Sequence, residues 1–130
     1  MTDIRSKPCS ACPYRQDCPS GLWAAHEYEK LRPYDNITPD QPWAPFMCHA
    51  TPRAFCNGWA ITHTRRGREF DLLALRMNGY PEIPAETEPL FASGNEAADW
   101  GQRDIEDPSD EAMETVARLL RKYPRLRDED

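Results

Sequence analysis

Four of the five cysteines in this chain form two close pairs, and this arrangement constrains the fold more than any other feature. Cys9 and Cys12 are separated by two residues, and Cys48 and Cys56 by seven. A tight turn directs two such thiolates the same way, so a second pair from elsewhere in the chain can complete a four-thiolate site. Disulfides and unrelated buried thiols are the alternatives. The pattern predicts a metal or cluster site at Cys9, Cys12, Cys48 and Cys56.

Two further residues are reserve ligands. Cys18 follows Cys12 after five residues and could replace one of the four cysteines. His49 directly follows Cys48 and could bind the metal, although a structural hydrogen-bonding role is favoured. His63 lies two helical turns, about 10 Å, beyond Cys56, which is too far to share the metal. We therefore expect His63 to be a buried, hydrogen-bonded side chain.

The apolar composition is thin for a domain of this size. Leu, Ile, Val and Phe together make up only 19 of the 130 residues, while there are 13 prolines. Such a chain cannot form an ordinary aliphatic core. The four Trp and five Tyr partly compensate, because each aromatic ring buries a large area. A bound metal would supply much of the missing stability, since site formation and folding then become one equilibrium.

The sequence predicts a mainly α, small irregular helical domain with proline-rich loops organised around the four cysteines. The single valine and the lack of an alternating apolar run argue against a substantial sheet. Aromatic residues Trp43 and Phe46 in the loop 33–47 are expected to lie over the core or the metal site. Residues 1–123 should form one domain and residues 124–130 a frayed charged tail. Helices are expected over 21–31 with Ser20 as N-cap, 51–64, 68–77, 95–100, and 110–123 with Ser109 as N-cap.

Charge narrows the range of partners. The chain has a net charge of −6, and residues 81–130 hold six basic against fourteen acidic side chains. Extended nucleic-acid binding is therefore not expected, because it depends on neutralising phosphates. Arg65, Arg66 and Arg68 form a short basic run that could contact an acidic protein surface or phosphate, or simply be a solvated turn. We expect a protein partner; the oligomeric state stays open.

No run approaches the roughly 18 apolar residues of a membrane span, and the N-terminus lacks an apolar signal segment. A cytoplasmic location is expected, where thiols stay reduced.

Zinc and a [4Fe–4S] cluster both accept four thiolates. Zinc knuckles usually space each pair by two to four residues, so the wider second pair favours the cluster. The Cys12-Pro13 and Cys18-Pro19 steps and the nearby Trp59 also suit a shielded cluster. A [4Fe–4S] cluster is the expected cofactor, with one Zn²⁺ as the alternative.

The segment Cys9–Cys18 resembles the Cys-x2-Cys-Pro-x-Arg-x2-Cys segment of WhiB-like iron–sulfur regulators. These are small actinobacterial and phage proteins that bind a [4Fe–4S] cluster and typically a sigma factor of RNA polymerase. They take their remaining cysteine from upstream of this segment, whereas no cysteine precedes Cys9 here.

A longer resemblance is to an uncharacterised family of small actinobacterial and phage proteins. Its pattern is matched here by four segments: Cys9 to Arg15, Pro19 to Trp23, Cys48-His49, and Cys56 to Trp59. The family pattern does not require a cysteine at position 18. This resemblance favours Cys9, Cys12, Cys48 and Cys56 as the ligands and implies no activity.

These features together predict a small cluster-binding regulatory or interaction protein that could act on transcription machinery. A zinc-stabilised structural or adaptor module is the first alternative, and a redox or electron-transfer component is the second. The sequence contains no phosphate-binding loop, nucleophile motif or spaced acid–base pair, so no catalytic residue is assigned and an enzyme is the less favoured class.

Overall fold

The computed structural model describes residues 3–51, 53–64, 71–79 and 81–124. The described chain is mainly helical, as the sequence predicts, and it contains isolated bridges in place of regular strands. The helices are α1 (Ala25–Glu29), α2 (Asn57–Thr64), α3 (Leu73–Arg76), α4 (Gly94–Gln102) and α5 (Asp110–Lys122), with the 3-10 turns η1 (Arg32–Asp35) and η2 (Thr38–Asp40). None of the helices in the described segments has the length and apolarity needed to cross a bilayer.

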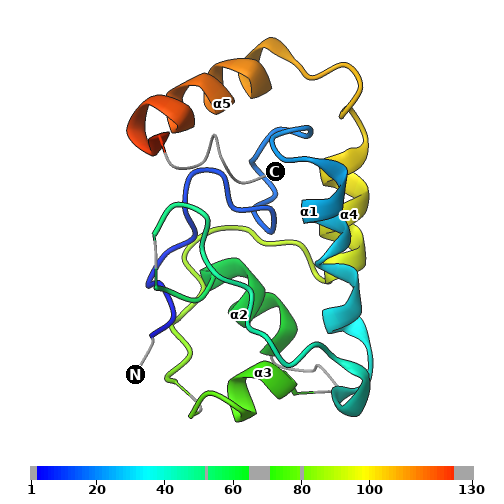
Figure 1. Cartoon of the computed structure of the whole chain (residues 1–130), viewed down its shortest axis with the longest axis vertical. Helices are drawn as coiled ribbons and strands as arrows, with labels where there is room; N and C mark the ends of the chain where they lie inside the picture. The colour runs from blue at the N-terminus through cyan, green and yellow to red at the C-terminus, as the bar shows by residue number, and fades with distance from the viewer. Residues whose placement is uncertain (1–2, 52, 65–70, 80, 125–130) are drawn as a thin grey trace.

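The helices surround a set of irregular loops. Helices α1 and α4 lie side by side along one edge, α5 covers one end, and α3 lies near the opposite end (Figure 1). A Cβ on Gly101 would collide with the ring of Tyr28, so glycine is what permits this close approach of α4 to α1. Helix α2 lies near α3 and contacts α4, and its side chains form much of the core.

Aromatic rings take the place of the missing aliphatic side chains in the main core. Trp59 and Tyr14 are fully buried, and Trp59 makes edge-to-face contacts with Tyr34 and Phe55. Such ring pairs add about 0.5–1.5 kcal/mol each beyond the area they bury. A second, smaller apolar cluster holds α5 against the N-terminal loop, and it contains Ala11, Cys18, Leu22, Ala112 and Leu119.

The two C-terminal helices agree with the predictions. Helix α5 begins after Ser109, whose hydroxyl accepts a hydrogen bond from the Ala112 amide at 3.1 Å. Helix α4 covers the predicted 95–100 segment and is capped in the same way by Ser93. In both cases a local N-cap signal is sufficient to define the start of the helix.

The predicted start of the 51–64 helix is wrong, because α2 begins only at Asn57. Residues before it pair with other segments: the Cys48 amide donates to Ala54 at 2.9 Å and the Cys56 amide to Phe46 at 2.8 Å. Phe55 also bridges to Ile4. These pairings hold Phe55 and Cys56 outside the helix.

The predicted 21–31 helix is also too long, since α1 covers only Ala25–Glu29. Ser20 does not cap it. Its hydroxyl donates to the Gly101 carbonyl at 3.0 Å and accepts from the Asp104 amide at 2.8 Å, so it ties the loop to α4 instead. Gly21 has φ 83°, a left-handed conformation that a helix cannot include.

Two other predictions have mixed outcomes. Phe46 is buried as expected, but Trp43 is 70% exposed and does not cover the core. The predicted 68–77 helix is observed as Leu73–Arg76, with residues 68–70 outside the described segments. Arg65, Arg66 and Arg68, and all but the first residue of the predicted tail at 124–130, also lie outside them.

Candidate metal centre

The four paired cysteines are all buried and all reduced. The Cys12 and Cys56 sulfurs lie 3.7 Å apart, and the Cys9 thiol hydrogen-bonds to Cys48. Each contact joins one cysteine from the N-terminal loop to one from the 48–56 segment. The two contacting pairs also interact electrostatically with each other. The chain therefore gathers these four thiols from two distant stretches.

Two turns position the cysteines. In the first, the Cys12 amide donates to the Cys9 carbonyl at 3.1 Å, so both side chains leave the same tight turn. In the second, Met47 pairs with Phe55 in an antiparallel bridge, so that Cys48 lies opposite Ala54 and Cys56 opposite Phe46, and the two cysteines lie two positions apart on the same face of a short hairpin.

Backbone amides converge on the sulfurs. Cys9 accepts from the amide of Ala11, Cys12 from those of Tyr14 and Gly58, and Cys56 from that of Trp59. Cys48 accepts from Ala50 and from Thr51, the latter at 3.3 Å. The donors to Cys12 and Cys56 include the first-turn amides of α2, where the helix field favours negative charge.

Arg5 adds a positive charge at the same place. Its Nη1 donates to the Cys48 sulfur at 3.6 Å and to the Thr51 hydroxyl at 2.7 Å. N–H groups and a guanidinium directed at sulfur stabilise thiolate over thiol. The site is therefore built for sulfur carrying negative charge.

The pKa values follow this geometry. The hydrogen bond from the Cys9 thiol lowers the pKa of Cys48 to about 4, and the same bond raises the pKa of Cys9. Burial opposes ionisation of Cys12, but hydrogen bonds from Cys56, Tyr14 and Gly58 leave its pKa below the ordinary value. Burial raises the pKa of Cys56. In each pair the pKa of one cysteine is therefore lowered and that of its partner is raised.

The sulfurs are grouped in twos rather than around a single point. Within the segments that the structure describes, no three His, Cys, Asp or Glu side chains approach closely enough to enclose an ion. Four sulfurs bound at about 2.3 Å to one tetrahedral ion lie about 3.8 Å from each other. The Cys12–Cys56 separation already has this value, which is also the separation of two packed thiols.

The reserve ligands are used elsewhere. Cys18 belongs to the apolar cluster under α5, where its thiol donates to the Ser10 carbonyl at 3.2 Å and burial raises its pKa to about 12. His49 Nε2 lies 3.0 Å from a Glu27 carboxylate oxygen, and its ring stacks on Trp23. These contacts agree with the structural role expected for His49.

His63 is a buried, hydrogen-bonded side chain, as expected: it is 1% exposed and Nε2 lies 2.9 Å from the Tyr14 hydroxyl. Sequence reasoning missed Arg5 as a neighbour of Cys48, because no local pattern marks a contact across 43 positions. It also gave Gly58 no role, although the Gly58-Trp59 step beside Cys56 was a visible signal.

Gly58 is expected to be essential to the site. A Cβ at this position would lie 2.7 Å from the Cys12 sulfur and 2.6 Å from Tyr14 Cβ. In an open helix, Gly→Ala stabilises by roughly 1 kcal/mol. Here overpacking of about 1–3 kcal/mol reverses the sign. Gly58→Ala should therefore lower the thermal midpoint; a higher midpoint would contradict this contact.

Comparison with known proteins gives one match. A family model described as a family of unknown function (DUF6283) matches residues 4–121, a range that contains all five cysteines. No curated protein matches the chain, and no solved structure matches it.

Proposed function

Because the chain belongs to the family of unknown function DUF6283, its role must be inferred from its own chemistry, and we propose that it is a small metal-binding interaction or regulatory protein. Cys9, Cys12, Cys48 and Cys56 hold the metal. The observation that carries the proposal is the meeting of Cys12 and Cys56 at 3.7 Å inside a shell of N–H donors.

A metal explains features that buried thiols alone do not. An apolar thiol requires no hydrogen-bond donors, yet six backbone amides donate to the four sulfurs. Donors of this kind favour thiolates, and buried thiolates are costly unless a cation balances them. Arg5 supplies one positive charge against four sulfurs. A bound cation supplies the rest and displaces the remaining protons.

The hairpin geometry supports a single tetrahedral ion, with Zn²⁺ the first candidate. The wide spacing of Cys48 and Cys56 argues against zinc, but the pairing of Met47 with Phe55 brings both cysteines to one face of a hairpin, which supports zinc despite that spacing. One ion requires the two pairs to move together. A [4Fe–4S] cluster instead requires each contacting pair to separate, since every thiolate then holds a different iron.

Four thiolates leave zinc no open position for substrate or water, so the ion is structural rather than catalytic. The function then depends on surfaces, and Trp43 is the most prominent exposed apolar group in the described segments. Its loop is fixed by Gln41, which bonds to Asn36, Asp71 and Leu73, and by the Tyr34 hydroxyl on Ala44. A rigid, exposed tryptophan is typical of protein-binding surfaces, which supports a protein partner.

The [4Fe–4S] cluster is the second candidate, supported by the resemblance of Cys9–Cys18 to WhiB-like regulators. In that case the protein would act on transcription machinery or in electron transfer, and the cytoplasm, where thiols stay reduced, would be its location.

Metal and acid-labile sulfide analysis of anaerobically purified protein tests the proposal. We expect a colourless protein with one zinc per chain and no sulfide. A brown protein with matching iron and sulfide would select the second candidate. A fully reduced, folded protein with neither metal would contradict both.

A further inference from the structure

A chain of polar contacts leads from the cysteine site to the start of α4. Tyr14 lies two residues after Cys12, and its backbone amide donates to the Cys12 sulfur. Its fully buried hydroxyl lies 2.9 Å from His63 Nε2. His63 is in α2, the helix that begins directly after Cys56. The tyrosine and the histidine therefore both extend from segments that carry candidate ligands.

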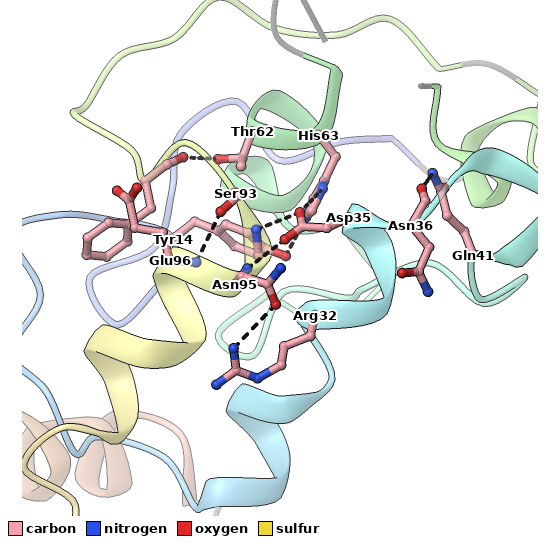
Figure 2. Close-up of polar contacts among 12 residues, drawn as sticks. Tyr14, Arg32, Asp35, Asn36, Gln41, Thr62, His63, Ser93, Asn95 and Glu96 are labelled. Carbon is pink, nitrogen blue, oxygen red and sulfur yellow. Dashed lines mark hydrogen bonds and ion pairs between the residues drawn. The ribbon is translucent and has the colours of Figure 1, made fainter. Parts of the chain in front are cut away.

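Asp35 continues the chain. His63 Nδ1 lies 3.4 Å from Asp35 Oδ1, and the carboxylate accepts from the Gly94 amide at 2.9 Å and the Asn95 amide at 2.7 Å. Figure 2 shows His63, Asp35 and the first turn of α4 meeting at one point. The first amides of a helix have no carbonyl partner in a preceding turn, and Asp35 accepts hydrogen bonds from two of them in α4. Its carboxylate also places a negative charge at the positive end of the helix dipole.

Close contact leaves little freedom at this junction. A Cβ on Gly94 would collide with the Leu31 carbonyl, so the start of α4 is held directly against the turn that follows α1. The far end of α4 also contacts the cysteine loop, because Trp100 Nε1 donates to the Cys18 carbonyl at 2.8 Å. Helix α4 is therefore attached at its start to Asp35 and at its end to the N-terminal loop that also carries Cys9 and Cys12.

We propose that α4 responds to the state of the metal site through Tyr14, His63 and Asp35, so that loss of the metal loosens α4 from α1. This inference depends on the proposed function. Loosening would expose Ala97 and Ala98, which are fully buried in the structure. Because coupling is reciprocal, a metal that favours the attached state of α4 must bind more weakly when the start of α4 is released.

A double-mutant cycle on the metal-loaded protein tests the chain. Tyr14→Phe removes only the hydroxyl and keeps the amide that donates to Cys12. Asp35→Asn removes the carboxylate charge at the other end. Each should weaken metal affinity about tenfold, the lower range for groups that orient metal ligands. Each should also speed hydrogen exchange in the peptide 93–98.

The double-mutant cycle distinguishes two cases: Tyr14 and Asp35 act on metal binding through one series of contacts, or each substitution weakens metal binding independently. If the residues act in series, the double variant should bind metal about as well as the weaker single variant, whereas independent effects multiply. Tyr34→Phe is the matched control: its hydroxyl bonds to Ala44 and its ring also contacts His63, but it lies outside the chain. It should leave the exchange of 93–98 unchanged.

Three results would overturn the inference. These are multiplying effects in the double variant, an unchanged metal affinity in Asp35→Asn, or a Tyr34→Phe variant that behaves like Tyr14→Phe. With any of these results, the proposed function is still supported if the wild-type protein carries one metal per chain. A wild-type protein without metal overturns both.

Discussion

Removal of the metal from the reduced protein is expected to abolish its cooperative thermal transition. The main core is assembled around the site: Cys9, Cys12, Cys48 and Cys56 all belong to it, together with the aromatic residues. Structural zinc contributes roughly 10–16 kcal/mol of apparent binding free energy. This is as large as the whole net stability of about 5–15 kcal/mol of an ordinary domain. A core with so few aliphatic residues cannot supply a comparable free energy once the metal is lost.

The measurement is thermal melting followed by near-ultraviolet circular dichroism, with a chelator and a reductant present throughout. Chelator already saturated with Zn²⁺ is the control for non-specific effects. We expect the transition to disappear with free chelator and to return when Zn²⁺ is added back. A stripped, reduced protein that stays compact and melts cooperatively would contradict the proposal that the metal holds the fold.

Cys12→Ser should impair metal binding and folding about as severely as removal of the metal, while Cys18→Ser should leave metal binding nearly unchanged. The Cys12 sulfur contacts Cys56 and accepts from two amides, so its loss removes a ligand at the centre of the site. We expect metal affinity to fall by more than about a hundredfold, beyond the range for changes to groups that only orient ligands. Cys18 lies in the separate cluster under α5, and a serine there can still donate to Ser10.

The two variants form a matched pair, since both replace one buried sulfur with oxygen. Metal content and a chelator competition assay compare them directly. Cys18→Ser should keep one metal per chain and lose about 1 kcal/mol of stability, as an ordinary buried substitution does. Equal metal loss in both variants would show that Cys18 is a ligand and that the four-cysteine assignment is wrong.

Local signals were enough to predict part of this structure. Ser109 marks the start of α5 because an N-cap acts within one helical turn. The two-residue spacing of Cys9 and Cys12 likewise determines a turn that directs both sulfurs together. The mainly helical class follows from the single valine and the proline-rich loops.

Long-range pairing explains what the sequence did not predict. The sequence predicts a helix from residue 51, but Phe55 forms bridges to Ile4 and Met47, and the helix begins only after Cys56. The positions of Arg5 beside Cys48 and of Asp35 beside His63 depend on the complete tertiary fold. No periodicity or spacing in a single sequence encodes contacts of this kind.

The exposure of Trp43 has a practical consequence for finding what this protein binds. Trp59 is fully buried and Trp23 and Trp100 are partly buried, so Trp43 differs from the other indoles in its access to solvent. A soluble quencher will therefore quench the fluorescence of Trp43 at lower concentrations than that of the other tryptophans. Any molecule that docks over this loop will protect that emission, and the native protein thereby carries its own optical reporter for screening candidate partners without a label.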